Sequence, residues 1–426
     1  VLTSRPHGQT VCSQQKPLPN QACKAGWSSL ISVNKFIKTL PFQRSGFATI
    51  KKGIKTNPLM QSDPQKPYYF SSLALMLLVF NFAACSSSTS SSNRDINILD
   101  GELTWLIAEH EIIDGGPGQD GIPSIDDPVY IPASEADYLS DERRVLGVKI
   151  FDEIFAYPIQ IMDWHEVVND DVDGRTFSVT YCPLTATGIV WDSRSEFGTS
   201  GLLYRNNLVA YDRNTESLWS QMLMRSVNGE RIGESTRLID QVVEVAWKTW
   251  KEIYPQSKVL STNTGFDRDY NSWAYGKEYE EKHDIFIFPP KNRLDTRLQS
   301  KSRVHALFPE GNLDENSDIR VYELKQFDED LELVEDTFDG KEIIIAGSRD
   351  DLFAVSFEAA HDRGFKAVKS GLPVILETPD GTRWDLFGEA VSGPLTGEKL
   401  DGMRSYTGYW FGLRDIFSEP EIYIFE

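Results

Sequence analysis

The sequence predicts an α+β fold that is rich in antiparallel strands and made of two pseudo-repeated halves. Short β-patterned runs alternate with turn signals such as Asp-Gly and Asn-Gly along most of the chain. One pattern of residues occurs twice at matched offsets, and each copy closes with a helical period and then an extended run. We therefore expect each half to consist mostly of antiparallel strands and to end in a helix and a strand.

The N-terminal region is expected to stand apart from this fold. Residues 1–59 contain no acidic side chain and little apolar periodicity, and we interpret them as a disordered upstream extension. Residues 60–84 begin with a methionine and close with an apolar run of 15 residues, at 70–84. A membrane-spanning helix needs roughly 20 such residues, so this run is predicted to be a secretory signal segment.

Small residues directly before Cys85 are typical of a lipoprotein signal, which makes Cys85 the predicted lipidation site. Residues 85–100 are expected to form a Ser-rich flexible tether. The protein would then be exported and held by its lipid in the bacterial envelope, with the outer membrane favoured. An ordinary signal peptide or a buried helix is the alternative interpretation of the apolar run.

The charge of the chain bears on its partners. Residues 1–84 hold ten of the 43 basic side chains and one of the 64 acids, so the remainder has a net charge of −30. Such a domain repels phosphate backbones and anionic head groups, which argues against nucleic-acid binding. The membrane partner would therefore be reached through the lipid and not through a basic face.

The two predicted halves span residues 101–262 and 301–426, joined by a crossover at 263–300 that shows no clear period. An Asp-Gly pair precedes a β-rich run in each half, at 173–174 and at 339–340. Apolar residues at helical spacing predict one helix over 238–253 and another over 406–417. Each is followed by an extended run, beginning at Val259 and at Ile422.

Reactive side chains concentrate between residues 163 and 221. Cys182 is the only cysteine left once Cys12, Cys23 and Cys85 are set aside, so no intramolecular disulfide is expected. A thiol becomes nucleophilic when a nearby histidine lowers its pKa, which makes Cys182 and His165 candidate catalytic residues, with Glu166, Asp163 or Asn169 to orient the imidazole. The alternative is that Cys182 is a small buried residue and His165 a structural histidine.

The same stretch supplies the candidate ligand-binding residues. Residues 198–201, Gly-Thr-Ser-Gly, are expected to form a loop whose N–H and hydroxyl groups hold an anion or polar ligand, or else a tight structural turn. Asp212 and Arg213 could instead form an internal ion pair, and Trp219 could belong to the core. The candidates are Trp164, Tyr181, Thr199, Ser200, Tyr204, Asn207, Asp212, Arg213 and Trp219.

A metal site is a further alternative, because His165 and Cys182 with a methionine would suit copper or zinc. The other histidines have no diagnostic spacing, and position 185 is Thr, so the chain has no Cys-x-x-Cys dithiol. The residues point to no particular cofactor.

Several of these motifs together resemble the bacterial domain-of-unknown-function family DUF3179. They are Asp-Trp-His-Glu-Val-Val-Asn-Asp at 163–170, Thr-Tyr-Cys-Pro-Leu at 180–184, Phe-Gly-Thr-Ser-Gly-Leu-Leu-Tyr at 197–204, Tyr-Asp-Arg at 211–213 and Glu-Ser-Leu-Trp-Ser-Gln at 216–221. The resemblance covers about residues 120–425 and implies an exported, often lipid-anchored protein without implying an activity. Many family members have Cys-Pro-Leu-Cys-Gly where this chain has Thr185 and Ala186, which removes a two-cysteine role here.

Two hypotheses from different classes follow. The leading one is that the protein binds a small polar ligand in a cleft of the first half, with thiol chemistry at Cys182 as an added step. The other is that it is a non-catalytic structural or interaction lipoprotein.

Overall fold

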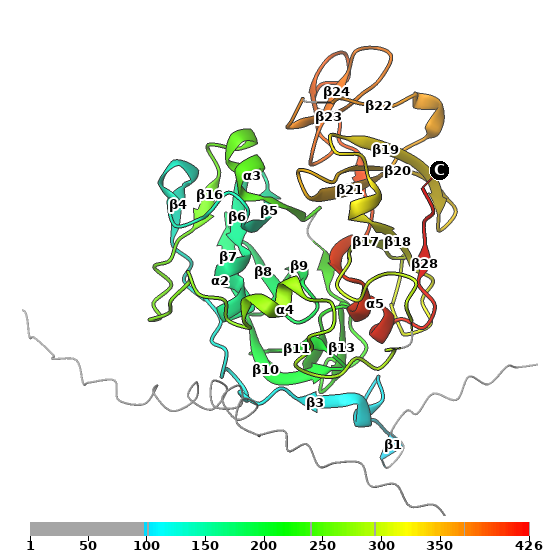
Figure 1. Ribbon diagram of the computed structural model, residues 1–426. Coiled ribbons are helices and arrows are strands. Elements are labelled where there is room, and N and C mark those ends of the chain that lie inside the picture. Colours follow the sequence, from blue (N-terminus) through cyan, green and yellow to red (C-terminus); the bar gives the residue numbers. More distant parts are fainter. Residues whose placement is uncertain (1–97, 100–101, 239–240, 294, 370, 426) are drawn as a thin grey trace, which may run out of the picture. The chain divides into compact units, whose positions relative to one another are not determined.

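The computed structural model describes residues 98–99, 102–238, 241–293, 295–369 and 371–425 (Figure 1). The predicted upstream extension, the signal segment, Cys85 and most of the tether lie outside the described residues. No helix in the described part of the chain is both long and apolar enough to cross a bilayer.

The first half contains three sheets with an antiparallel bias. Sheet 1a has the order β15 (Val243–Ala246), β5 (Arg144–Ile150), β6 (Glu153–Pro158), β16 (Lys258–Leu260), β4 (Tyr130–Pro132). Sheet 1b has the order β14 (Arg237–Leu238), β9 (Thr187–Asp192), β8 (Arg175–Cys182), β7 (Val167–Val172). Sheet 1c has the order β13 (Arg225–Asn228), β12 (Leu218–Ser220), β11 (Asn207–Asp212), β10 (Phe197–Tyr204), β3 (Ile112–Asp114).

The second half also has three sheets. Sheet 2a has the order β27 (Ser405–Tyr409), β17 (Arg303–Leu307), β18 (Arg320–Glu323), β28 (Glu421–Ile422). Sheet 2b has the order β26 (Asp401–Gly402), β21 (Phe353–Glu358), β20 (Lys341–Ser348), β19 (Glu332–Phe338). Sheet 2c has the order β25 (Ala390–Ser392), β24 (Arg383–Asp385), β23 (Val374–Glu377), β22 (Lys366–Ala367).

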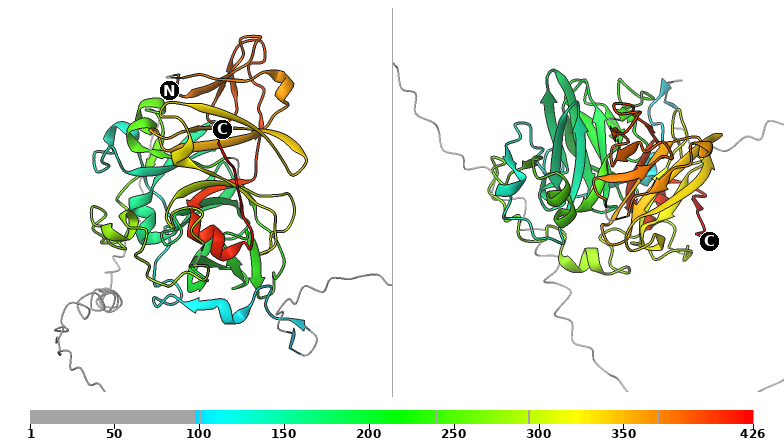
Figure 2. Two further views of the ribbon diagram at one scale, coloured as in Figure 1. Left: turned by 45° about the vertical axis from the view of Figure 1, so that its right-hand side comes forward. Right: turned by 90° about the horizontal axis from the view of Figure 1, so that it is seen from above.

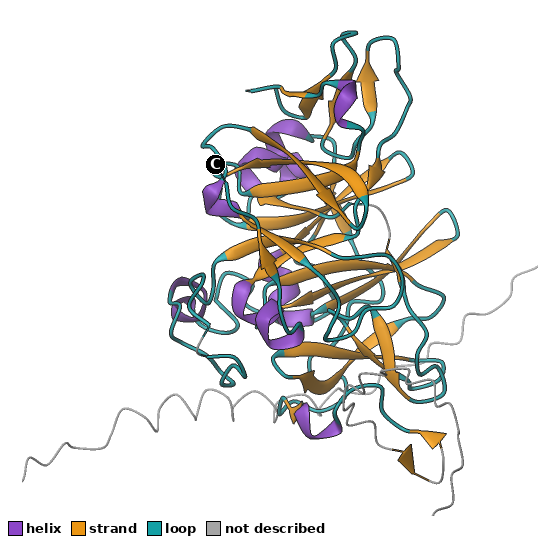
Figure 3. Cartoon of the chain, turned by 90° about the vertical axis from the view of Figure 1, so that its right-hand side faces the viewer, coloured by secondary structure: helices purple, strands orange, loops and turns teal. Residues whose placement is uncertain are grey.

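Helices are few and short beside these strands, which confirms the strand-rich α+β prediction (Figure 3). They are α2 (Ile159–His165), α3 (Trp247–Ile253), α4 (Lys277–Glu281) and α5 (Trp410–Ile416), with single 3-10 turns η1 (Glu109–Glu111), η2 (Ala133–Glu135), η3 (Leu324–Gln326) and η4 (His361–Arg363). A small ribbon, β1 (Ile98–Leu99) with β2 (Glu102–Leu103), precedes the sheets.

The strand orders of the two halves correspond. In sheets 1a and 2a the strand that follows the final helix pairs in parallel with an inner strand, β16 with β6 and β28 with β18, whereas their other pairs are antiparallel. The hairpins β7–β8 and β19–β20 both turn through an Asp-Gly pair with positive φ at both residues, 51° and 83° in the first and 51° and 75° in the second. Descent of the halves from one duplicated unit remains a prediction, which this correspondence supports.

The final helices are shorter than their periodicity predicts. Strand β15 lies at 243–246 within the first predicted span and β27 covers 406–409 of the second, so each helix begins only after its strand. Val243 and Val245 are both fully buried, because β15 lies at the edge of sheet 1a but is covered by the second half. A strand buried on both faces has no period-2 signal and is easily taken for part of a helix.

The two halves share a core. Strand β27 packs against β9, and β15 packs against β21, so the green and the yellow-to-red strands lie side by side in both views of Figure 2. One hydrophobic cluster contains Trp191 and Trp219 from the first half together with Tyr406 and Trp410 from the second. A second cluster also combines residues of both halves, whereas a third, smaller one lies entirely in the second half.

Candidate functional site

Helix α2 and strand β8 bring the Trp-His-Glu and Cys-Pro-Leu motifs together. The helix buries Ile161 and Met162 completely and ends at Glu166, which has a left-handed φ of 60° and donates its N–H to the Met162 carbonyl at 2.7 Å. The Glu166 carbonyl then accepts the Tyr181 N–H at 2.7 Å, which places the end of the helix beside the end of β8. The C-terminus of α2 therefore lies next to Cys182, the last residue of β8.

His165 is fully buried, and both of its ring nitrogens have partners. Nδ1 lies 2.7 Å from the Pro123 carbonyl and Nε2 lies 2.6 Å from the Tyr270 hydroxyl. A carbonyl only accepts, so Nδ1 carries the proton and the Tyr270 hydroxyl donates to Nε2. Burial lowers the pKa of His165 to about 4, so the ring is neutral at physiological pH.

Cys182 does not pair with this imidazole. Its thiol lies 3.7 Å from the Asn206 carbonyl, the residue is 1% exposed, and no hydrogen bond joins it to His165 within the described part of the chain. Burial, and then the nearby Glu166 carboxyl, raise the pKa of Cys182 to about 11. The predicted Cys182–His165 hydrogen bond is therefore not formed in this structure: each group has a different partner, and the raised pKa keeps the thiol protonated at neutral pH.

Two carboxyls at the end of α2 are buried. Burial raises the pKa of Glu166 to about 7, although the Tyr275 hydroxyl donates to its Oε1 at 2.9 Å. Asp163 is 7% exposed, and no side chain or backbone group in the described residues donates a hydrogen bond to it. Its pKa is raised well above the ordinary value by burial, and then by the charge of Glu280. Glu166 thus belongs to the site, but beside Asp163 and not as the orienting partner of His165.

The crossover covers this region. We call residues 263–281 the strap; they are irregular except for α4, which lies in front of β8 and β9 in Figure 1. Three strap tyrosines reach the site with their hydroxyls: Tyr270 contacts His165, Tyr275 contacts Glu166, and Tyr279 donates to the Leu184 carbonyl at 2.7 Å. The sequence interpretation missed the strap, and the recurrence of tyrosine in a segment without period was the available signal.

Arginines from both halves balance the carboxyls. Arg143 stacks on Trp273 of the strap, 3.8 Å from the ring centroid, and its charge and that of Arg303 act on Asp163. Glu244 accepts from Arg144 at 2.6 Å and from Arg303. Trp164, half-buried, and Tyr181, buried, lie in this same region at the ends of α2 and β8.

The predicted 198–201 loop is instead the middle of β10. Register shifts between Thr199 and Leu202, so the Gly-Thr-Ser-Gly run forms a bulge and not an anion-binding loop. Thr199 donates its hydroxyl to the Ile122 carbonyl at 2.7 Å, and Ser200 donates to the Val209 carbonyl at 2.5 Å. Both hydroxyls therefore fix the backbone and are not available to a ligand.

Asn207 lies in a polar network inside the core. Its amide nitrogen donates to Gln221 Oε1 at 2.8 Å and to the Thr185 hydroxyl at 3.0 Å, and its oxygen accepts the Met222 N–H at 3.1 Å. Gln221 in turn donates to the Thr180 hydroxyl at 3.1 Å. All these side chains are fully buried. The network joins sheets 1b and 1c, and Thr185 belongs to it.

The remaining candidates stabilise turns and surfaces. Asp212 accepts the Trp219 indole N–H at 3.0 Å and caps the turn that follows β11 through Thr215. Arg213 donates to the Ser124 hydroxyl at 2.7 Å and lies 3.2 Å from Asp126, so it does not pair with Asp212. These contacts tie the segment before β4 to the sheets.

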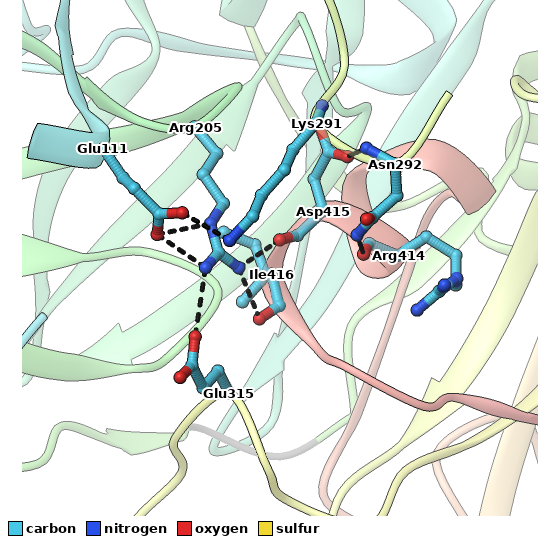
Figure 4. A network of polar contacts seen from close by, with 8 residues as sticks. All are labelled: Glu111, Arg205, Lys291, Asn292, Glu315, Arg414, Asp415 and Ile416. Carbon is cyan, nitrogen blue, oxygen red and sulfur yellow. Dashed lines mark hydrogen bonds and ion pairs between the residues drawn. The ribbon is translucent and has the colours of Figure 1, made fainter. Parts of the chain in front are cut away.

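Tyr204 lies beside a network of ion pairs and hydrogen bonds around Arg205, which the sequence interpretation missed. The guanidinium of Arg205 lies 4.9 Å from the Tyr204 ring and binds Glu111, Glu315 and the carbonyls of Asp415 and Ile416 (Figure 4). Asp415 accepts the N–H groups of Lys291 and Asn292 at 3.0 and 2.9 Å. This network fastens α5 of the second half to sheet 1c and to the crossover.

The described residues contain no group of three or more His, Cys, Asp or Glu side chains placed to hold a metal ion. The copper or zinc alternative at His165 and Cys182 therefore has no geometric basis there. Two surface hollows, of about 480 and 420 Å³, lie elsewhere, and neither is lined by Cys182, His165 or Glu166. The predicted cleft is therefore neither of these two hollows, and strap tyrosines contact His165, Glu166 and the Leu184 carbonyl at the predicted site.

A family model described as a protein of unknown function, DUF3179, matches residues 119–419. No curated protein and no solved structure matches the chain.

Proposed function

This chain belongs to the DUF3179 family, and we propose that it is an exported, lipid-anchored envelope protein that binds a small polar ligand at Asp163 and Glu166 beneath the strap. One observation carries the proposal. Asp163 is a carboxyl that is almost fully buried and receives no hydrogen bond from the described residues. Its oxygens are not among the fully buried side-chain atoms that lack a partner, so water can reach them and a bound ligand can donate to them in its place.

The surroundings of Asp163 define the ligand. Glu166 and Glu280 add negative potential, whereas Arg143 and Arg303 offset part of it. A ligand with an ammonium group or several hydroxyls suits this combination, because it donates to the carboxyls while the half-buried Trp164 and Trp273 offer flat apolar surface. Groups with displaced pKa values gathered in one region are also typical of binding and catalytic sites.

Access depends on the strap. The Tyr270 and Tyr275 hydroxyls contact His165 and Glu166, so a ligand reaches the carboxyls only when these contacts open. Catalysis through Cys182 is not part of the proposal, because its thiol is protonated and has no base. The geometry favours a binding protein.

The test uses two sugars that differ at one group. Glucosamine carries an ammonium where N-acetylglucosamine carries a neutral amide, and both present hydroxyls. We expect the folded domain to bind glucosamine more tightly in calorimetric titration, and hydrogen exchange in residues 263–281 to slow on binding. Asp163→Asn should weaken glucosamine binding by about tenfold or more, whereas the exposed control Asp137→Asn should not change it.

Wild-type protein that binds neither sugar, or equal binding by Asp163→Asn and wild type, would count against the proposal. A folding control accompanies the variant: Asp163→Asn removes a buried carboxyl with a raised pKa, so its thermal stability should be equal to or above that of wild type.

A further inference from the structure

The hollow of about 420 Å³ lies between the halves and is distinct from the Asp163 region. Its walls come from β14, the segment after β17, and the segment that joins β26 to β27. Among the described residues, three cationic side chains line it, Arg237, Lys399 and Arg404, with one acid, Glu310. Glu310 forms an ion pair with Lys341 at 3.5 Å, so its charge is already partly balanced. The hollow is therefore a basic site on a strongly acidic domain.

Two of these cations have no carboxylate partner. Neither Arg237 nor Arg404 forms an ion pair with any residue that the structure describes, although acids outnumber bases in the chain by 64 to 43. Arg404 donates from Nη1 to the carbonyls of Gly311 and Pro309, at 2.5 and 3.4 Å, and its other guanidinium nitrogens make no hydrogen bond with described residues. Burial lowers the pKa of Arg404, which means that its charge is poorly solvated.

An anion would relieve this cost. A guanidinium presents its N–H groups in a planar fork that matches a carboxylate or phosphate, and the pairing is strongest where water is partly excluded. The hollow also has apolar walls, Leu238, Phe387 and Met403, and its volume is within the range of small-molecule sites. We propose that it binds a small organic anion, with a carboxylate or phosphate group at Arg237 and Arg404 and an apolar part against Phe387.

The test is calorimetric titration of the whole folded domain with phenyl phosphate, benzoate and benzyl alcohol. We expect phenyl phosphate and benzoate to bind and benzyl alcohol, which lacks the charge, to bind at least about tenfold more weakly. Whichever of the two anions binds more tightly identifies the head group as phosphate or carboxylate.

Three variants complete the test. Arg404→Gln and Arg237→Gln should each weaken anion binding by about tenfold, and Arg194→Gln, the same change at an exposed arginine outside the hollow, should leave it unchanged. Arg237 is exposed, so its variant keeps the test valid if Arg404→Gln does not fold. Failure of wild type to bind either anion, or equal loss in Arg194→Gln, overturns the proposal. The result is independent of the Asp163 site, which glucosamine tests separately.

Discussion

Replacing Glu166 by glutamine is expected to stabilise the protein, and more so as the pH rises. Burial raises the pKa of this carboxyl from its ordinary 4.5 to about 7. This rise in pKa means that the ionised form of Glu166 makes folding about 3 kcal/mol less favourable than the protonated form does. Glutamine has nearly the same shape, carries no charge, and its oxygen can still accept the hydroxyl hydrogen of Tyr275.

The sign follows from the two protonation equilibria. Glu166 is protonated in the folded state up to about pH 7 but ionises in the unfolded state above about pH 4.5, so the folded state holds the extra proton between these values. The contribution of Glu166 to stability is therefore fully present below the unfolded pKa and is lost as the pH rises through the folded pKa. Wild type should lose about 2–3 kcal/mol relative to Glu166→Gln between about pH 5 and about pH 8.

Urea unfolding followed by tryptophan fluorescence at several pH values measures this difference. Glu252→Gln, at an exposed position of α3, is the matched control and should run parallel to wild type at every pH. A stability difference between Glu166→Gln and wild type that stays constant across the pH range would refute the reasoning, because it would mean that the carboxyl ionises normally in the folded protein.

Two further predictions concern Cys182 and the Asp-Gly turns. The pKa of Cys182 is raised to about 11 and 1% of the residue is exposed, so its thiol should react with a thiol reagent at neutral pH only when the protein unfolds. Its labelling rate should therefore rise with urea along the unfolding curve. Rapid labelling of the native protein would contradict the buried geometry. Gly174→Ala and Gly340→Ala should each cost about 1 kcal/mol in urea unfolding, because both glycines have positive φ and open space where the Cβ would go; clearly unequal costs would show that the two turns are not equivalent.

Much of the architecture could be predicted because it depends on local patterns. The Asp-Gly turns, the short strands and the final helix and strand of each half follow from residues that are neighbours in the chain. The start of the first of these helices was misjudged because all four residues of β15 are buried, which depends on a strand of the other half.

The site depends much more on contacts that are distant in the sequence. The motifs at 163–166 and 180–184 do meet, as their shared chemistry suggested, but the partner of each group could not be read from spacing. His165 contacts Tyr270 and Cys182 contacts Asn206, residues 105 and 24 positions away. The reactive 198–201 run and Asn207 proved to be structural, because hydroxyls and amides inside a core must satisfy the backbone and one another.

Residue types and short-range patterns were enough to predict the strand-rich α+β class, the family and the stretch between residues 163 and 221 where reactive side chains concentrate. Those features depend on residue type and on short-range order. The fold alone placed the strap over the site, left Asp163 without a donor among the described residues, and brought Arg237 and Arg404 to one hollow without an ion-pair partner among them. In each case the free energy depends on the desolvation of a charged group and on the partners that it gains. Those partners are set by the fold and not by the distance along the chain.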